Sequence, residues 1–213
     1  MSTSERAVLR RVLKEQGIAS QAVLDAIGTV PRELFVPEDL KGEAYVNAPL
    51  PIGEGQTVSQ PYTVAYMVEL AGVAPGTRVL EVGAGSGYAA AIIAEVVGDA
   101  ALVTAVEVLP SLVNRARKNL SAAGYPEVRV VEGDGRRGYA AGAPYDAIVV
   151  SAEARHVPPA LVEQLADEGS LVIPVRESGF AAVMQRVEKR GERTEMSTHG
   201  AFSFVPLTGS DDS

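Results

Sequence analysis

The sequence predicts an α/β fold with a mostly parallel, doubly wound sheet, and three observations indicate it. Strand-like and helix-like segments alternate between residues 78 and 175, which is typical of a parallel sheet with helices on both faces. Residues 145–150 are almost wholly apolar, as expected of a strand covered on both sides. Gly83, Gly85 and Gly87 join a strand-like segment directly to an alanine-rich helical one. The predicted core is therefore Rossmann-like.

The first 58 residues predict a helical cap followed by a lid. Apolar residues recur at helical spacing over residues 5–16, and a second short helix is expected over 21–27. Prolines make residues 30–38 a non-helical connector. Two prolines and two glycines interrupt residues 45–58 and predict an irregular lid. A loop of that length inside a compact chain is usually functional.

The core elements then alternate. Helices are expected from Pro61 and from Pro110, because proline is tolerated in the first turn of a helix. The remaining helices are predicted over 88–97 and 158–165, and the strands over 79–82, 101–106, 128–131, 145–150 and 170–175.

The C-terminal part departs from this alternation. Residues 180–187 and 194–205 are both strand-like and are joined by a charged turn at 188–192, which predicts an antiparallel hairpin at the sheet edge. Residues 211–213 are expected to form a frayed tail. The predicted organisation is a single domain over 1–213, with a cap and lid over 1–58, a core over 59–176 and C-terminal strands over 177–213.

Composition narrows the classes of function. The chain has 213 residues, no cysteine and two histidines, so it can form no disulfide and no thiolate metal site, and no metal site is predicted. Its first residues are not expected to form a signal peptide, and no apolar run is long enough to span a bilayer, so a soluble, cytoplasmic protein without a membrane partner is expected. The formal net charge of −8 opposes the contacts that dominate nucleic-acid binding, so no nucleic-acid partner is expected. A monomer is expected.

The glycine turn predicts a ligand site, because glycines allow a ligand to approach the backbone closely. In a dinucleotide fingerprint the third glycine comes three positions after the second. Here it comes two positions after, and Tyr88 occupies the expected place. Glu81 just before the turn would repel a pyrophosphate but suits a cationic amine or sulfonium. The alternative is a glycine turn that only packs a helix on the sheet.

Two more acidic signals follow neighbouring strands. Glu107 ends the second strand of the core, where its carboxylate can accept hydrogen bonds from the hydroxyls of a ribose. Asp134, followed by Gly135, comes after the third strand and could bind an adenine amino group. Alternatively, Glu107 caps the next helix and Asp134 forms a turn. Because the carboxyl ends of parallel strands meet at one edge, their joint placement favours an adenosyl ligand.

Two motifs carry a resemblance to known families. The Glu-x-Gly-x-Gly-x-Gly pattern at 81–87 resembles the first motif of S-adenosylmethionine-dependent methyltransferases, and residues 51–62, Pro-Ile-Gly-Glu-Gly-Gln-Thr-Val-Ser-Gln-Pro-Tyr, resemble the signature of the protein-L-isoaspartate O-methyltransferase family. Further matching segments lie at 30–37, 145–148, 159–165, 173–175 and 204–208, so the resemblance covers nearly the whole chain in order.

The resemblance implies a Rossmann-like methyltransferase fold and a reaction. S-adenosylmethionine would donate its methyl group to the free α-carboxylate of L-isoaspartyl residues in damaged peptides and proteins, leaving S-adenosylhomocysteine. The ester then collapses to a succinimide, and hydrolysis restores some normal aspartate. The resemblance places Ser59 at the active site. Together with Glu81, the implied cofactor contacts are Thr57, Val58, Gly83, Gly85, Gly87, Glu107, Asp134, Gly135 and Thr208.

The chemistry of this reaction suits the chain. A carboxylate with a pKa near 4 is already ionised at neutral pH and needs no general base. Ser59 would donate a hydrogen bond that orients the carboxylate; its alternative role is to cap the helix that begins at Pro61. Glu153 would disfavour an acidic substrate if it pointed inward, so we expect it to point out. Two alternative functions are a methyltransferase for one dedicated peptide and a non-catalytic adenosyl-ligand binding module.

Overall fold

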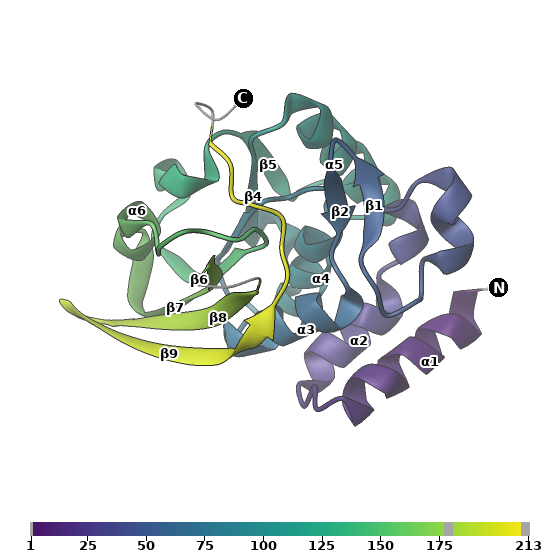
Figure 1. Ribbon diagram of the computed structural model, residues 1–213, viewed down its shortest axis with the longest axis horizontal. Helices are drawn as coiled ribbons and strands as arrows, with labels where there is room; N and C mark the ends of the chain where they lie inside the picture. The colour runs from purple at the N-terminus through teal and green to yellow at the C-terminus, as the bar shows by residue number, and fades with distance from the viewer. Residues whose placement is uncertain (1, 177–180, 210–213) are drawn as a thin grey trace.

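The computed structural model describes residues 2–176 and 181–209, so the expected tail at 211–213 and the expected strand start at 180 lie outside the described residues. Its core is a seven-stranded sheet of order β5-β4-β3-β6-β7-β8-β9 (Figure 1). The strands are β3 (Val79–Val82), β4 (Val103–Glu107), β5 (Arg129–Glu132), β6 (Tyr145–Val150), β7 (Leu165–Arg176), β8 (Ala182–Arg190) and β9 (Arg193–Phe202).

The strand pairing confirms the predicted fold class. The five strands from β5 to β7 pair in parallel, whereas β7, β8 and β9 pair antiparallel. Val82 at the end of β3 lies between Val106 of β4 and Val150 of β6, so the carboxyl ends of the three strands are level. The chain reverses its direction across the sheet between β3 and β6, which is where open α/β sheets bind ligands.

Helices cover the two faces of the sheet unequally. The cap helices α1 (Ser2–Glu15) and α2 (Gln21–Thr29) join α3 (Pro61–Leu70), α4 (Tyr88–Val97) and α5 (Pro110–Ala123) in one hydrophobic cluster. The opposite face packs against the short helix α6 (Pro159–Glu163) and against Tyr139 and Ala143, which flank a 3-10 turn. Alternate residues of β3 face the two clusters, Val79 one and Leu80 the other, as the period-two geometry of a strand requires.

Several segments differ from the expected elements; the connector predicted as non-helical, for example, contains the 3-10 helix η1 (Arg32–Leu34). The lid is not irregular: β1 (Leu50–Gly53) and β2 (Gln56–Val58) form an antiparallel hairpin, whose register shifts between Pro51 and Gly53. Helix α6 ends before the predicted residue 165. Strand β7 begins earlier than predicted, because Leu165 already pairs with Tyr145 before a bulge over the next polar residues.

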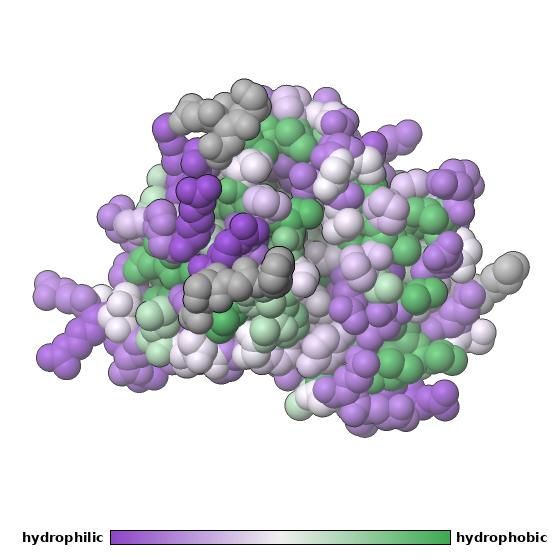
Figure 2. Space-filling view, in the orientation of Figure 1, coloured by the Kyte–Doolittle hydropathy of each residue, from purple (hydrophilic) through white to green (hydrophobic). Residues whose placement is uncertain are grey.

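The hairpin of β8 and β9 lies at the sheet edge, as predicted, and its tip carries hydrophilic side chains (Figure 2). Among residues 2–176 and 181–209, no helix has the length and apolar content that a membrane crossing requires.

Candidate functional site

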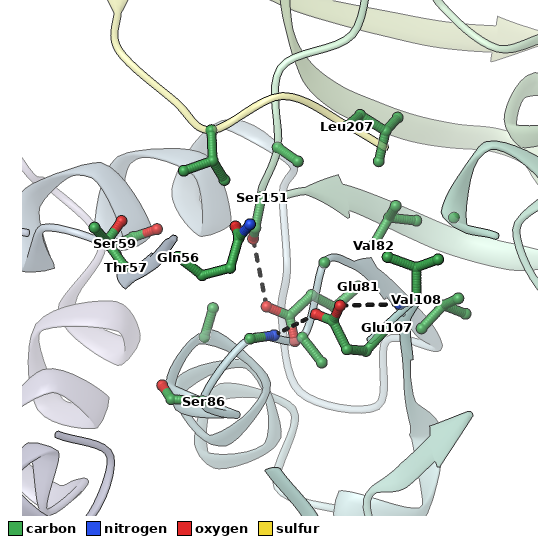
Figure 3. Close-up of a pocket in the computed structure, with 18 of the residues that line it drawn as sticks. Gln56, Thr57, Ser59, Glu81, Val82, Ser86, Glu107, Val108, Ser151 and Leu207 are labelled. Atoms are coloured by element: carbon green, nitrogen blue, oxygen red, sulfur yellow. Dashed lines mark hydrogen bonds between the residues drawn. The ribbon is translucent and has the colours of Figure 1, made fainter. Parts of the chain in front are cut away.

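A pocket lies at the carboxyl ends of β3, β4 and β6, with the β1–β2 hairpin and residues 205–208 as further walls (Figure 3). Its empty volume is about 730 Å³, including the part open to solvent. Most of the predicted site residues line it, namely Thr57, Val58, Ser59, Glu81, Gly83, Gly85, Glu107, Gly135 and Thr208.

The glycine turn forms the floor of this pocket. Gly83 has a φ of +90° and Gly85 a φ of +54°. Residues other than glycine rarely adopt such a backbone conformation. The amides of Gly83 and Ala84 both donate to the carbonyl of Val106, at 2.8 and 3.1 Å. Ile52 of the hairpin packs directly over Gly85. The turn is therefore fixed from both sides, and its backbone faces the pocket.

Glu107 is held by three backbone amides. Its Oε1 accepts from Val108 at 2.9 Å and Leu109 at 3.0 Å, and its Oε2 accepts from Gly85 at 2.9 Å. The carboxylate is nearly buried, with 7% of the residue exposed, and two of these bonds are drawn in Figure 3. Two carboxylate oxygens offer about four acceptor sites, so at least one acceptor site remains for a ligand hydroxyl.

Glu81 is a buried carboxyl group, and one of its oxygens lacks a hydrogen-bond partner. The residue is 1% exposed; Ser151 Oγ donates to its Oε1 at 3.3 Å, while Oε2 has no hydrogen-bond partner. Burial raises the pKa of Glu81 well above its usual value; the bond from Ser151 and the nearby backbone amide of Ala90 oppose this rise, and the charge of Glu107 adds to it. A buried carboxyl group is costly to ionise without a compensating charge, so Glu81, which lines the pocket, is suited to a ligand that carries a hydrogen-bond donor and a positive charge.

Ser59 lies where this pocket meets a second one. It follows β2 directly, and both pockets are lined by Thr57, Ser59, Ser151 and Val205. The second pocket has an empty volume of about 990 Å³, open solvent included, and extends to Tyr62 and Phe204. The predicted alternative role for Ser59 as a helix cap is wrong, because Gln60 occupies the N-cap position of α3.

Gly87 and Asp134 are the predicted site residues that do not line the first pocket. At Gly87 a Cβ atom would lie 3.1 Å from Leu120 Cγ, so this glycine allows α4 to pack against α5. Asp134 accepts from the amide of Arg136 at 2.9 Å and pairs with Arg136 Nη2 at 2.7 Å. The hydrogen bond from Arg136 lowers the pKa of Asp134 against the opposing effect of burial. Its contact with an adenine remains a prediction.

Sequence comparison decides the family. The model of the family described as protein-L-isoaspartate(D-aspartate) O-methyltransferase (PCMT) matches residues 3–212. The chain belongs to this family. A protein-L-isoaspartate O-methyltransferase of Ignicoccus hospitalis is 47% identical over 207 residues, which cover 97% of this chain and 98% of the relative. One from Methylorubrum populi is 48% identical over 208 residues, covering 97% and 96% of the two chains.

Solved structures of the PCMT family agree with the fold. One named protein-L-isoaspartate O-methyltransferase superposes with a TM-score of 0.89 at 30% identity, covering 96% of this chain and 66% of the other, longer chain. A putative family member from Plasmodium falciparum, solved in complex with S-adenosyl-L-homocysteine, superposes with a TM-score of 0.82 at 25% identity, covering 94% and 97%. Both superpositions confirm the predicted architecture over nearly the whole chain.

Some pocket residues of this PCMT family member were not predicted. Ser151 follows β6 at the same sheet edge as the glycine turn, so the strand-end rule that identified Glu107 also applies to it. Gln56 in β2 carries no comparable signal. Residues 205–207 reach the pocket because the chain returns to β6: the amide of Glu153 donates to Val205 at 2.8 Å, and that of Leu207 donates to Glu153 at 2.7 Å.

Glu153 points away from both pockets, as expected, but it is buried and not exposed to solvent. The residue is only 8% exposed, and its carboxylate is paired with Arg176 at the end of β7. It does not line either pocket. The arginine supplies the compensating charge that a buried carboxylate needs, so Glu153 is buried without presenting an unpaired charge to the site.

Proposed function

We propose that this chain transfers the methyl group of S-adenosylmethionine to the free α-carboxylate of L-isoaspartyl residues in peptides and damaged proteins, leaving S-adenosylhomocysteine. The observation that carries the proposal is the meeting of two pockets at Ser59. One pocket contains the glycine turn and two carboxyl groups, and the other opens toward solvent beside aromatic side chains. A methyl donor in the first pocket and a peptide in the second would face each other at Ser59. Family membership over residues 3–212 supports the same reaction.

The first pocket fits the methyl donor by the chemistry of its side chains. Glu81 is a buried carboxyl group that lines this pocket, which suits the positively charged amino group of the cofactor. Glu107 keeps an acceptor site for a ribose hydroxyl, and the backbone at Gly83 and Gly85 leaves room beside them. When bound, S-adenosylmethionine supplies an electrophilic methyl group on a positively charged sulfur. The proposed cofactor contacts therefore rest on the two carboxyl groups and on the backbone of the glycine turn.

The residues of this chain would act by orientation. The substrate carboxylate has a pKa near 4 and is ionised at neutral pH, so no general base is required. Ser59 would donate a hydrogen bond to one carboxylate oxygen and direct the other toward the methyl group. One oxygen–carbon bond forms while the sulfur–carbon bond breaks, giving a methyl ester and a neutral thioether. Such positioning can contribute up to about 7–11 kcal/mol of the barrier reduction.

A peptide assay tests the proposal. Release of S-adenosylhomocysteine would be followed with an isoaspartyl peptide, the same peptide containing normal aspartate, and no peptide. We expect turnover with the isoaspartyl peptide alone. Equal turnover on both peptides would overturn the repair function, and tight cofactor binding without turnover on either would indicate a non-catalytic binding module. Turnover confined to one sequence context among several isoaspartyl peptides would indicate a dedicated peptide substrate.

We further propose that the chain acts as a single-domain, cytoplasmic monomer without a nucleic-acid or membrane partner. One hydrophobic cluster joins cap residues such as Leu9 to core residues such as Met184, which supports a single domain. Both pockets are lined by residues of one chain, and the net charge of −8 opposes binding to polyanions. Light scattering coupled to size exclusion tests the monomer, and a dimer mass would contradict it.

A further inference from the structure

Arg32 carries a guanidinium group that is completely enclosed by the protein. The residue begins the 3-10 turn η1 (Arg32–Leu34) and is 0% exposed. Arginine is almost never fully buried unless its charge is compensated. Burial lowers the pKa of Arg32, and the nearby Tyr88 and Tyr45 oppose this effect. The group therefore occupies a costly position, and its partners indicate what it does there.

Four backbone carbonyls from two separate segments receive its hydrogen bonds. Nη1 donates to Ala44 at 2.6 Å and to Val46 at 3.2 Å, and Nη2 donates to Ala48 at 3.0 Å and to Ser59 at 3.0 Å. The first three carbonyls belong to the stretch that enters the lid hairpin, and the fourth belongs to the residue that leaves it. One guanidinium thus closes both ends of the β1–β2 hairpin.

The same side chain also contacts the wall of the first pocket. The guanidinium carbon lies 5.3 Å from the ring centroid of Tyr88, and Tyr88 lines that pocket. Tyr88 is the first residue of α4, directly after the glycine turn. Arg32 therefore connects the backbone of Ser59 to the element that positions the turn.

We propose that Arg32 is the positioning residue of the reaction: it fixes the backbone of Ser59 relative to the glycine turn, so that the Ser59 hydroxyl meets the substrate carboxylate. This inference rests on the proposed function. Arg32 touches neither pocket's interior, so it acts through Ser59 and not on the reacting atoms. A planar fork with five fixed donors can serve carbonyls on two sides at once, whereas a lysine ammonium cannot.

The test compares Arg32→Lys with Arg6→Lys. Arg6 stabilises the same cap through Tyr45, Glu33 and the carbonyl of Thr29, but it does not bond to Ser59, so it controls for general loosening of the cap. Both variants would be assayed well below their melting temperatures. We expect Arg32→Lys to lower kcat on the isoaspartyl peptide by about ten- to a hundredfold, because small displacements of a positioned group are costly.

Two further measurements separate positioning from a structural role. The Kd for S-adenosylhomocysteine should change by less than about twofold in Arg32→Lys, and kcat should stay within about twofold of wild type in Arg6→Lys. Added guanidinium should restore part of the kcat of Arg32→Ala, whereas the same concentration of ammonium should not. Equal losses of kcat in the two lysine variants would overturn the inference. Failure of the Arg32 variants to fold, even with guanidinium present, would assign Arg32 to the fold alone and also overturn it.

The outcomes distinguish this inference from the proposed function. If the wild-type chain does not methylate the isoaspartyl peptide, the proposed function is wrong. If the wild type is active and Arg32→Lys retains its kcat, the function stands and the positioning role is wrong.

Discussion

Replacing Glu107 by glutamine tests how the first pocket holds its ligand. The carboxylate accepts three backbone hydrogen bonds, two at Oε1 and one at Oε2. A glutamine side chain has nearly the same shape but only one oxygen, and its NH₂ group cannot accept from an amide. The better orientation keeps the oxygen toward Val108 and Leu109 and places the NH₂ group against the amide of Gly85.

The magnitude follows from the bonds that this orientation loses. Hydrogen bonds to a charged group contribute about 1.5–3 kcal/mol each. Loss of the bond to Gly85 should therefore lower the free energy of unfolding by about 1.5–3 kcal/mol. Loss of the charged acceptor for a ribose hydroxyl should cost a similar amount in binding, which corresponds to a Kd about 10- to 150-fold higher.

Calorimetric titration with S-adenosylhomocysteine measures the Kd, and denaturant unfolding measures the stability. Glu132→Gln is the matched control. Glu132 lies on β5, directly beside Glu107 of β4, but its side chain is exposed. We expect the control to bind like the wild type. A folded Glu107→Gln variant with unchanged affinity would refute the ribose assignment.

Three further predictions concern other residues of the site. Ser59→Ala should lower kcat about tenfold or more while leaving the Kd for S-adenosylhomocysteine unchanged, since it removes one hydrogen bond to the charged substrate; a collapse of cofactor affinity in titrations would contradict its orienting role. Because the folded-state pKa of Glu81 is raised, ionisation opposes folding, and stability is lost as pH rises from the unfolded value of 4.5 toward the folded one. The melting temperature of ligand-free Glu81→Gln should therefore exceed that of wild type by a margin that grows between pH 5 and pH 8, and a constant margin would show that Glu81 does not titrate in this way. Gly87→Ala should destabilise the fold by about 1–2 kcal/mol because of its left-handed backbone, and by about 1–3 kcal/mol more because its Cβ contacts Leu120. In the control Gly98→Ala the added Cβ meets nothing within 4 Å, so only the backbone effect is expected. Reduced cofactor affinity in Gly87→Ala, measured at a temperature where the variant is folded, would support the cofactor contact predicted from sequence.

The sequence predicted the elements of the core well, because the patterns that mark them extend over only a few neighbouring residues. The bounds of β3, α4 and β6 match the prediction, since glycine and apolar periodicity mark them directly. The lid was harder: its prolines and glycines indicate interruption, but the pairing of Leu50 with Val58 depends on two strands that are too short to show alternation. Proline at 51 remains compatible with a strand because the hairpin is two-stranded and exposes one edge.

Contacts between distant segments set the limit of prediction in the site. Strand ends identified Glu81 and Glu107, because the edge of a parallel sheet follows from the order of its elements. No local pattern indicates that Arg32, in a proline-flanked connector, has its guanidinium buried among carbonyls 12 to 27 residues away. Likewise the pairing of Glu153 with Arg176 joins two elements, whereas the prediction for Glu153 considered only its repulsion of an acidic substrate. The sequence therefore did not predict the burial of charged side chains whose partners lie in other elements.

The wall supplied by residues 205–208 has a consequence for the synthesis of the protein. During translation the glycine turn and both carboxyl groups leave the ribosome about a hundred residues before this wall. A nascent chain that has already folded β3 to β6 still lacks one side of the cavity. A chain that ends before residue 205 would therefore lack this side of the ligand pocket.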